Sequence, residues 1–177
     1  MEFKRLRSVT YAGVLIALLV AVQFFAAGIG GQFVAGPLVN LILIISVMLC
    51  GLRIGLTVGV VSPVCAKLIG IGPFWTLIPF IILGNAAFVI VWHFSERINA
   101  DVIVVRHLIT AAAAAVVKFA VLYIGIVMIA VPFLLDIPAQ AAAVVTNMFS
   151  YPQMLTAFAG GAAASVVVPI LKKAVIF

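Results

Sequence analysis

Long apolar runs, interrupted by short polar or glycine- and proline-containing segments, make up nearly the whole chain. Runs of this kind are typical of helices that cross a lipid bilayer, each of which needs about 20 mostly apolar residues. We expect six membrane-spanning helices, at residues 8–27, 37–50, 54–69, 74–94, 107–131 and 152–171. Segment 139–149 is expected to form a short helix that leads into the last span.

Transmembrane strands do not fit this pattern. Barrel strands alternate polar and apolar residues over about ten positions, whereas these runs are longer and apolar on all sides. Inside a bilayer every backbone group must then be bonded within a helix. The fold class is therefore an all-α membrane protein, and residues 1–177 are expected to form a single transmembrane domain.

The breaks between the runs differ in character. Segment 28–36 is glycine-rich and uncharged, 51–53 is a tight turn, and 70–73 combines two glycines with a proline. Segment 95–106 is polar, and 132–138 begins and ends with proline. The 28–36 connection has the composition of a mobile loop.

Composition and charge agree with a membrane protein and indicate its orientation. Apolar residue types make up 67% of the chain and charged types only 8%, too few for the surface of a soluble domain. The net charge of +6 comes mainly from basic residues in every second connection between the apolar runs. Membrane topology explains these residues, so no nucleic-acid partner needs to be assumed. An excess of basic residues marks cytoplasmic loops, so both termini are expected in the cytoplasm. The basic residues on that side are Lys4, Arg5, Arg7, Arg53, Arg97, Arg106, Lys172 and Lys173.

Lys118 breaks the charge pattern, because it lies deep inside an apolar run. It is about 18 Å along the helix axis from Arg106, at 1.5 Å per residue, which is too far for its side chain to reach the cytoplasmic interface. A charge at this depth must face the bundle interior or a watered cavity. Two readings stay open: an ion pair with Asp136 of the outer loop, or a contact with an anionic ligand, which we favour.

Amides and aromatic residues gather in the same outer half of the predicted bundle. Interhelical hydrogen bonding and anchoring at the membrane interface could each explain single members of the set. Together with a buried cation they would form a pocket for a small, partly flat, hydrogen-bonding molecule. The candidate substrate-binding residues are Lys118, Asn85, Asn40, Trp75, Tyr123, Asn147, Tyr151 and Gln153.

Catalytic chemistry is not indicated. The sequence has no acidic pair within a span, no metal-ligand motif and no GxxxxGK[ST] loop for ATP. We therefore expect no enzyme activity, no metal site and no cofactor in this chain, and any ATP-driven work would need partner subunits.

Small residues recur at four-residue spacing, which lets helix backbones approach closely in lipid. One such stripe is Gly13, Ala17 and Ala21 in the first span. Two others, at residues 51, 55 and 59 and at residues 160 and 164, are expected to pack within the chain.

The first-span segment Ala12–Ala21 is similar to the small-xxx-small signature of the S components of energy-coupling factor (ECF) vitamin transporters. The chain also resembles that family in size, in its six expected spans, and in the segments 36–40 and 70–73 with Asn85. The resemblance implies a membrane-embedded subunit that captures a vitamin or related micronutrient from outside a prokaryotic plasma membrane. It further implies docking of Gly13, Ala17 and Ala21 onto a transmembrane scaffold subunit, and two ATPase subunits that use the ATP. The 28–36 connection would then be a lid over the ligand.

Three other classes of function remain as alternatives, and one of them is a structural membrane subunit that binds no ligand. A stand-alone proton-coupled secondary transporter would usually show internal repeats and a charged relay within the membrane. A membrane-embedded enzyme would need a catalytic set. Ligand retention on purification, as against proton-coupled uptake by the chain alone, would separate these alternatives.

Overall fold

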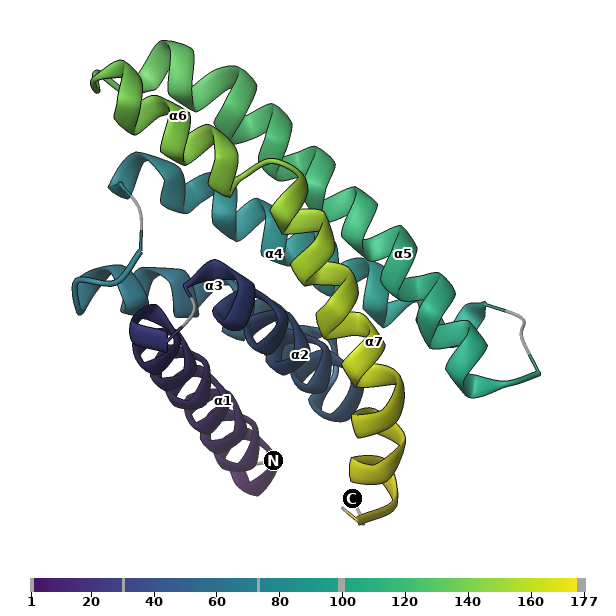
Figure 1. Ribbon diagram of the computed structural model, residues 1–177. Coiled ribbons are helices and arrows are strands. Elements are labelled where there is room, and N and C mark those ends of the chain that lie inside the picture. Colours follow the sequence, from purple (N-terminus) through teal and green to yellow (C-terminus); the bar gives the residue numbers. More distant parts are fainter. Residues whose placement is uncertain (1, 30, 73, 99–100, 175–177) are drawn as a thin grey trace.

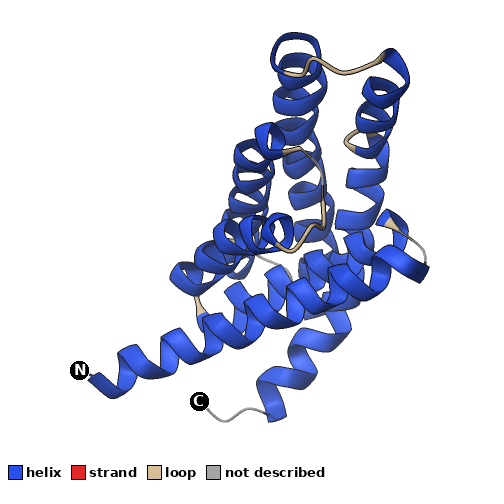
Figure 2. Ribbon diagram, turned by 90° about the vertical axis from the view of Figure 1, so that its left-hand side faces the viewer, coloured by secondary structure: helices blue, strands red, loops and turns tan. Residues whose placement is uncertain are grey.

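The computed structural model describes residues 2–29, 31–72, 74–98 and 101–174, and within these ranges all side chains except those of residues 2–8, 27–29 and 96. These segments fold as helices joined by short connections, and none of them forms a strand (Figures 1 and 2). The all-helical fold class predicted from the hydropathy pattern is confirmed. In chain order the elements are α1 (Glu2–Ile29), α2 (Gln32–Cys50), α3 (Leu52–Leu68), η1 (Trp75–Leu77), α4 (Ile78–His93), η2 (Ser95–Arg97), α5 (Ile103–Leu122), η3 (Tyr123–Leu134), α6 (Ala139–Met148) and α7 (Tyr151–Ala174).

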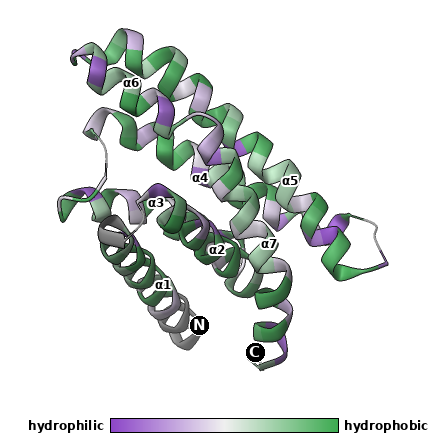
Figure 3. Cartoon of the chain, viewed as in Figure 1, coloured by the Kyte–Doolittle hydropathy of each residue, from purple (hydrophilic) through white to green (hydrophobic). Residues whose placement is uncertain are grey.

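Five helical segments among the described residues are long and apolar enough to cross a membrane. They are Val9–Ala26, Gln32–Cys50, Trp75–His93, Ile103–Leu134 and Ala139–Ala174. Hydrophobic residues predominate along the helices, as the colours in Figure 3 show. These features are consistent with a multi-pass membrane protein. The remaining long helix, α3, has 17 residues and is somewhat shorter.

The predicted loop at 28–36 is wrong. Helix α1 continues to Ile29 and α2 begins at Gln32, so most of the segment is helical, while Gly30 lies outside the described residues. Glycine costs a helix about 1 kcal/mol relative to alanine, but an unpaired backbone group in an apolar setting costs several. Helix formation therefore prevails over the flexibility of the glycines. Gly31 marks the turn, with φ of +55°.

The break predicted at 132–138 is also shorter than expected. The fifth helix begins at Ile103 and runs without interruption from α5 into η3, through Pro132 to Leu134. η3 is a π-helix, and at its end Leu135 N donates to Ala130 O, five residues earlier, at 2.9 Å. Proline removes one donor from a helix, and a local change of hydrogen-bond spacing can accommodate it.

Helix α7 packs against both α2 and α5, and α2 also contacts α1, α3 and α4. Close approach depends on glycine where α7 crosses α2. A Cβ atom on Gly160 would lie 2.6 Å from Pro37 O and 2.7 Å from Asn40 Cβ. A Cβ on Gly55 would lie 2.8 Å from Val47 Cβ of α2. The prediction that these two small-residue stripes pack within the chain is confirmed for residues 55, 59, 160 and 164, whereas Gly51 is exposed.

Helix α1 begins and α7 ends at the same end of the bundle, where the α2–α3 turn and the α4–α5 connection also lie (Figure 1). The turn is made by Gly51, whose φ of +88° suits glycine. The opposite end carries the α3–α4 connection and α6. The basic residues Arg53, Arg97, Arg106, Lys172 and Lys173 belong to segments at the first end.

Candidate functional site

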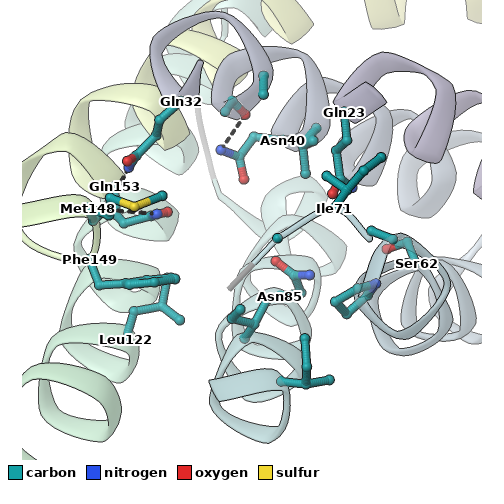
Figure 4. Close-up of a pocket in the computed structure, with 18 of the residues that line it drawn as sticks. Gln23, Gln32, Asn40, Ser62, Ile71, Asn85, Leu122, Met148, Phe149 and Gln153 are labelled. Carbon is teal, nitrogen blue, oxygen red and sulfur yellow. Dashed lines mark hydrogen bonds between the residues drawn. The ribbon is translucent and has the colours of Figure 1, made fainter. Parts of the chain in front are cut away.

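A cavity of about 380 Å³ lies between the helices, and its lining includes Gly31, Gly72 and Met148 from the end of the bundle that carries α6. This volume falls in the range usual for small-molecule sites. Its walls come from every long helix and from the α3–α4 connection (Figure 4). The polar or charged residues that line it are Gln23, Gln32, Asn40, Ser62, Asn85, Lys118 and Gln153, and the larger apolar ones are Val39, Pro63, Ile71, Ile78, Ile81, Leu122, Met148 and Phe149.

Lys118 of α5 lies at the cavity wall and is only 4% exposed. Its ammonium group donates to Asn40 Oδ1 at 2.7 Å and to Asn85 Oδ1 at 2.9 Å. The Nζ atom also lies 5.2 Å from the centroid of the Phe88 ring, within the range of a cation–π interaction. Residues 40, 85 and 118, predicted separately from three helices, are thus brought together.

The two asparagines are fixed in orientation by the backbone. Asn40 Nδ2 donates to Gly36 O at 2.8 Å, one turn earlier in α2. Asn85 Nδ2 donates to Gly59 O of α3 at 3.2 Å. That carbonyl is available because residue 63, four positions later, is a proline without an N–H group. With their amide nitrogens held in this way, both side chains turn their oxygens toward the ammonium group.

The ammonium group of Lys118 is stabilised by hydrogen bonds to two amide oxygens, but no opposite charge among the described residues neutralises it. Within the described part of the chain no carboxylate forms an ion pair with Lys118, and Asp136 is exposed. The ion pair between Lys118 and Asp136, one of the two interpretations of the sequence, is therefore not present. The side chains of Glu2 and Glu96 lie outside the described residues. An ammonium group has three donors, so the two asparagine oxygens leave one N–H for another acceptor.

Two glutamines join the first and last parts of the chain near the cavity. Gln32 Nε2 at the start of α2 donates to Met148 O at 2.6 Å, and Gln153 Nε2 of α7 donates to the same oxygen at 3.1 Å (Figure 4). Residue 153 was predicted as a site residue, and it lines the cavity. The α1–α2 turn is thereby tied to the α6–α7 turn.

The other four predicted site residues do not line the cavity. Trp75 is 53% exposed and Tyr151 62% exposed, and both Tyr123 and Asn147 are exposed as well. Tyr123 packs its ring against Phe119, with 5.4 Å between the centroids. The helix face that each occupies points away from the cavity, and their expected position in the outer half of the membrane stays a prediction. A role for them in binding stays a prediction.

Several lining residues were missed in the sequence. Gln23 precedes the segment taken as a loop and Gln32 lies within it, while Met148 ends the short helix before the last span and Phe149 follows directly after it. The sequence offered one usable signal for them, namely polar amides close to the ends of otherwise apolar helices. The sequence gave no clear indication of Ser62, because the hydroxyl group of a single serine in a membrane helix usually bonds to the backbone of that helix.

On the outside of the bundle, α1 presents part of its small-residue stripe. Gly13 and Ala17 are exposed, and a Cβ added to Gly13 would have no atom within 4 Å. Ala21 is half-buried. Within the part of the chain that the structure describes, nothing therefore covers the first two residues of this stripe.

Comparisons of the chain with family models, curated proteins and solved structures found no match. The class of the protein is consequently defined by its own features. It is a helical protein suited to a membrane, with a cavity whose polar wall centres on a buried, hydrogen-bonded lysine.

Proposed function

We propose that the chain is the substrate-binding subunit of an ATP-driven, ECF-type micronutrient importer, and that its cavity holds a small anionic ligand. The observation that carries the proposal is the Lys118 ammonium group, which is buried at the cavity wall without a carboxylate partner among the described residues. Removing an unpaired ion from water costs several kcal/mol. An anion arriving in the cavity would recover much of that cost.

The arrangement favours binding over catalysis. Asn40 and Asn85 use their oxygens on the ammonium and their amide nitrogens on backbone carbonyls. This rigid set keeps the remaining N–H of Lys118 ready for an acceptor, which lowers the cost of ordering the site when ligand enters. The apolar remainder of the lining suits the body of a small organic molecule.

Energy would come from other subunits. The sequence has no ATP-binding loop, and its first span resembles the docking signature of ECF S components. The exposure of Gly13 and Ala17 supports a role for this face in contacting a transmembrane scaffold subunit, which would itself carry two ATPases.

We further propose that α3 is the sixth span and that both termini are cytoplasmic in a prokaryotic plasma membrane. Seventeen residues lie at the lower limit for a spanning helix, and the basic residues at one end of the bundle follow the positive-inside rule. The cavity would then open toward the outside of the cell.

The proposal is tested by purifying the chain in mild detergent from cells grown in rich medium and identifying retained small molecules by native mass spectrometry and extraction. We expect a bound, negatively charged metabolite, and uptake in reconstituted vesicles only when scaffold and ATPase subunits are present. Uptake by the chain alone, driven by a proton gradient, would instead establish the secondary transporter.

A further inference from the structure

Ser62 of α3 lines the cavity next to Pro63 and is 1% exposed. Its Oγ atom has no hydrogen-bond partner among the described residues. Figure 4 shows the residue beside Ile71, across the cavity from Gln153 and Met148.

Other buried hydroxyl groups in the described helices behave differently. Ser46 Oγ donates to Leu43 O at 2.6 Å, and Ser165 Oγ donates to Ala162 O at 2.6 Å. A serine inside a helix normally satisfies its hydroxyl locally in this way. A buried hydroxyl without any partner is costly, and in a native protein it calls for an explanation such as a ligand.

The neighbouring polar groups do not supply the missing partner. The Lys118 ammonium bonds to Asn40 and Asn85, and it does not reach Ser62. Ser62 of α3 therefore forms a separate, uncharged polar position within the same cavity as Lys118 of α5.

The charge of the lining limits the ligand further. Among the described residues that line the cavity, Lys118 is the only one with a charged side chain. A second negative charge on the ligand would be taken from water without a cation to meet it, which is unfavourable. One anionic group, an apolar body and an uncharged polar group match the lining.

We propose that Ser62 is a ligand-binding residue, and that the ligand is a monoanion carrying, apart from its acidic group, an uncharged hydrogen-bonding group that Ser62 Oγ contacts. This inference rests on the proposed function, because it takes the cavity to be the ligand site. Beyond the proposed function, it identifies a residue that determines ligand specificity and assigns the ligand a single negative charge.

The test compares wild type, Ser62→Ala and the matched control Ser46→Ala in two measurements. The first is the melting temperature of the ligand-free, detergent-purified protein. The second is the ligand affinity, measured by titration calorimetry. The compound is chosen from nicotinate, pantothenate, biotin and the dicarboxylate folate as the one that raises the melting temperature of wild type most. Any molecule that wild type retains on purification is titrated as well.

We expect Ser62→Ala to melt no lower than wild type when empty, since it loses an unpaired hydroxyl, and to bind the monocarboxylate about fivefold to tenfold more weakly. Ser46→Ala should melt lower, because it loses a hydrogen bond, and bind as wild type does. Unchanged affinity in Ser62→Ala, or preference of wild type for folate or for a neutral or cationic molecule, overturns the inference while leaving a binding function in place. A lower melting temperature of empty Ser62→Ala together with unchanged affinity would assign the hydroxyl a structural role only. If wild type binds none of these compounds and retains nothing, the proposed function fails together with the inference.

Discussion

Replacing Lys118 with methionine removes the charge from the cavity while keeping an unbranched side chain of similar length. The structure allows the effect on binding to be estimated. The remaining N–H of the ammonium group would donate to an anionic acceptor in a site screened from water, and such a bond to a charged group contributes about 1.5–3 kcal/mol. Since about 1.4 kcal/mol corresponds to a factor of ten in affinity, we expect binding to weaken about tenfold to a hundredfold.

The effect of Lys118→Met on stability combines two opposing terms. Asn40 Oδ1 and Asn85 Oδ1 lose their donor and cannot turn away, because Gly36 O and Gly59 O hold their amide nitrogens. Each unpaired buried acceptor costs about 1–3 kcal/mol. Against this, the protein no longer buries an unneutralised ammonium, whose desolvation penalty is also several kcal/mol. We therefore expect the variant to stay folded.

The assay is titration calorimetry of detergent-purified protein with the molecule that wild type retains, with circular dichroism to verify the helical fold. Lys67→Met is the matched control. Lys67 is half-buried near the same end of the bundle and does not line the cavity, so its replacement should leave affinity unchanged. A loss smaller than about threefold in Lys118→Met, or an equal loss in both variants, would refute the assignment of Lys118 to the ligand.

Three further predictions concern the scaffold of the site and the outer face of α1. Asn85→Leu should lower the free energy of unfolding by about 2 kcal/mol in denaturant titrations, because a buried α3 carbonyl and the Lys118 ammonium group each lose a hydrogen-bond partner. Replacement of the exposed Asn147 with leucine should not lower it. Equal stability of the two variants would contradict the hydrogen-bond network around Lys118. Gly160→Ala should cost about 1–3 kcal/mol, because its Cβ would lie 2.6 Å from an α2 carbonyl oxygen, whereas Gly13→Ala, with open space around it, should melt no lower than wild type. Ala17→Trp should spare ligand affinity but reduce ATP-driven uptake about tenfold or more in vesicles with the partner subunits, and normal uptake would exclude this face from docking.

The buried lysine shows how far the sequence could be read. Its depth in an apolar run already required a cavity or a partner, and both asparagines that now bond to it were candidates because amides are costly in apolar surroundings. What the sequence left open was whether Asp136 or an anionic ligand compensates the lysine, and it did not predict the hydrogen bonds from Lys118 to the two asparagine oxygens. Those bonds depend on which helix faces meet, which is set by packing between residues 78 and 33 positions apart.

The aromatic residues and the loop show where sequence reasoning failed. Trp75 and Tyr151 were placed in the outer half of the bundle, but helices that are apolar on all sides give no periodic signal for which face turns inward. Segment 28–36 was expected to be a loop because of its glycines, yet the need to pair backbone groups in an apolar setting extended both flanking helices through most of it.

By itself the sequence determined the helical fold class, the positions of most helices and the presence of a cation that must be compensated, because hydropathy and charge act locally along the chain. Only the tertiary structure decided which polar side chains share one cavity. It also showed that, among the described residues, none bonds to the Ser62 hydroxyl and none covers Gly13 and Ala17 of α1. These features follow from the rotation of each helix about its axis. Close contacts, such as that of Gly160 with α2, fix this rotation, whereas a uniformly apolar run of sequence cannot specify it.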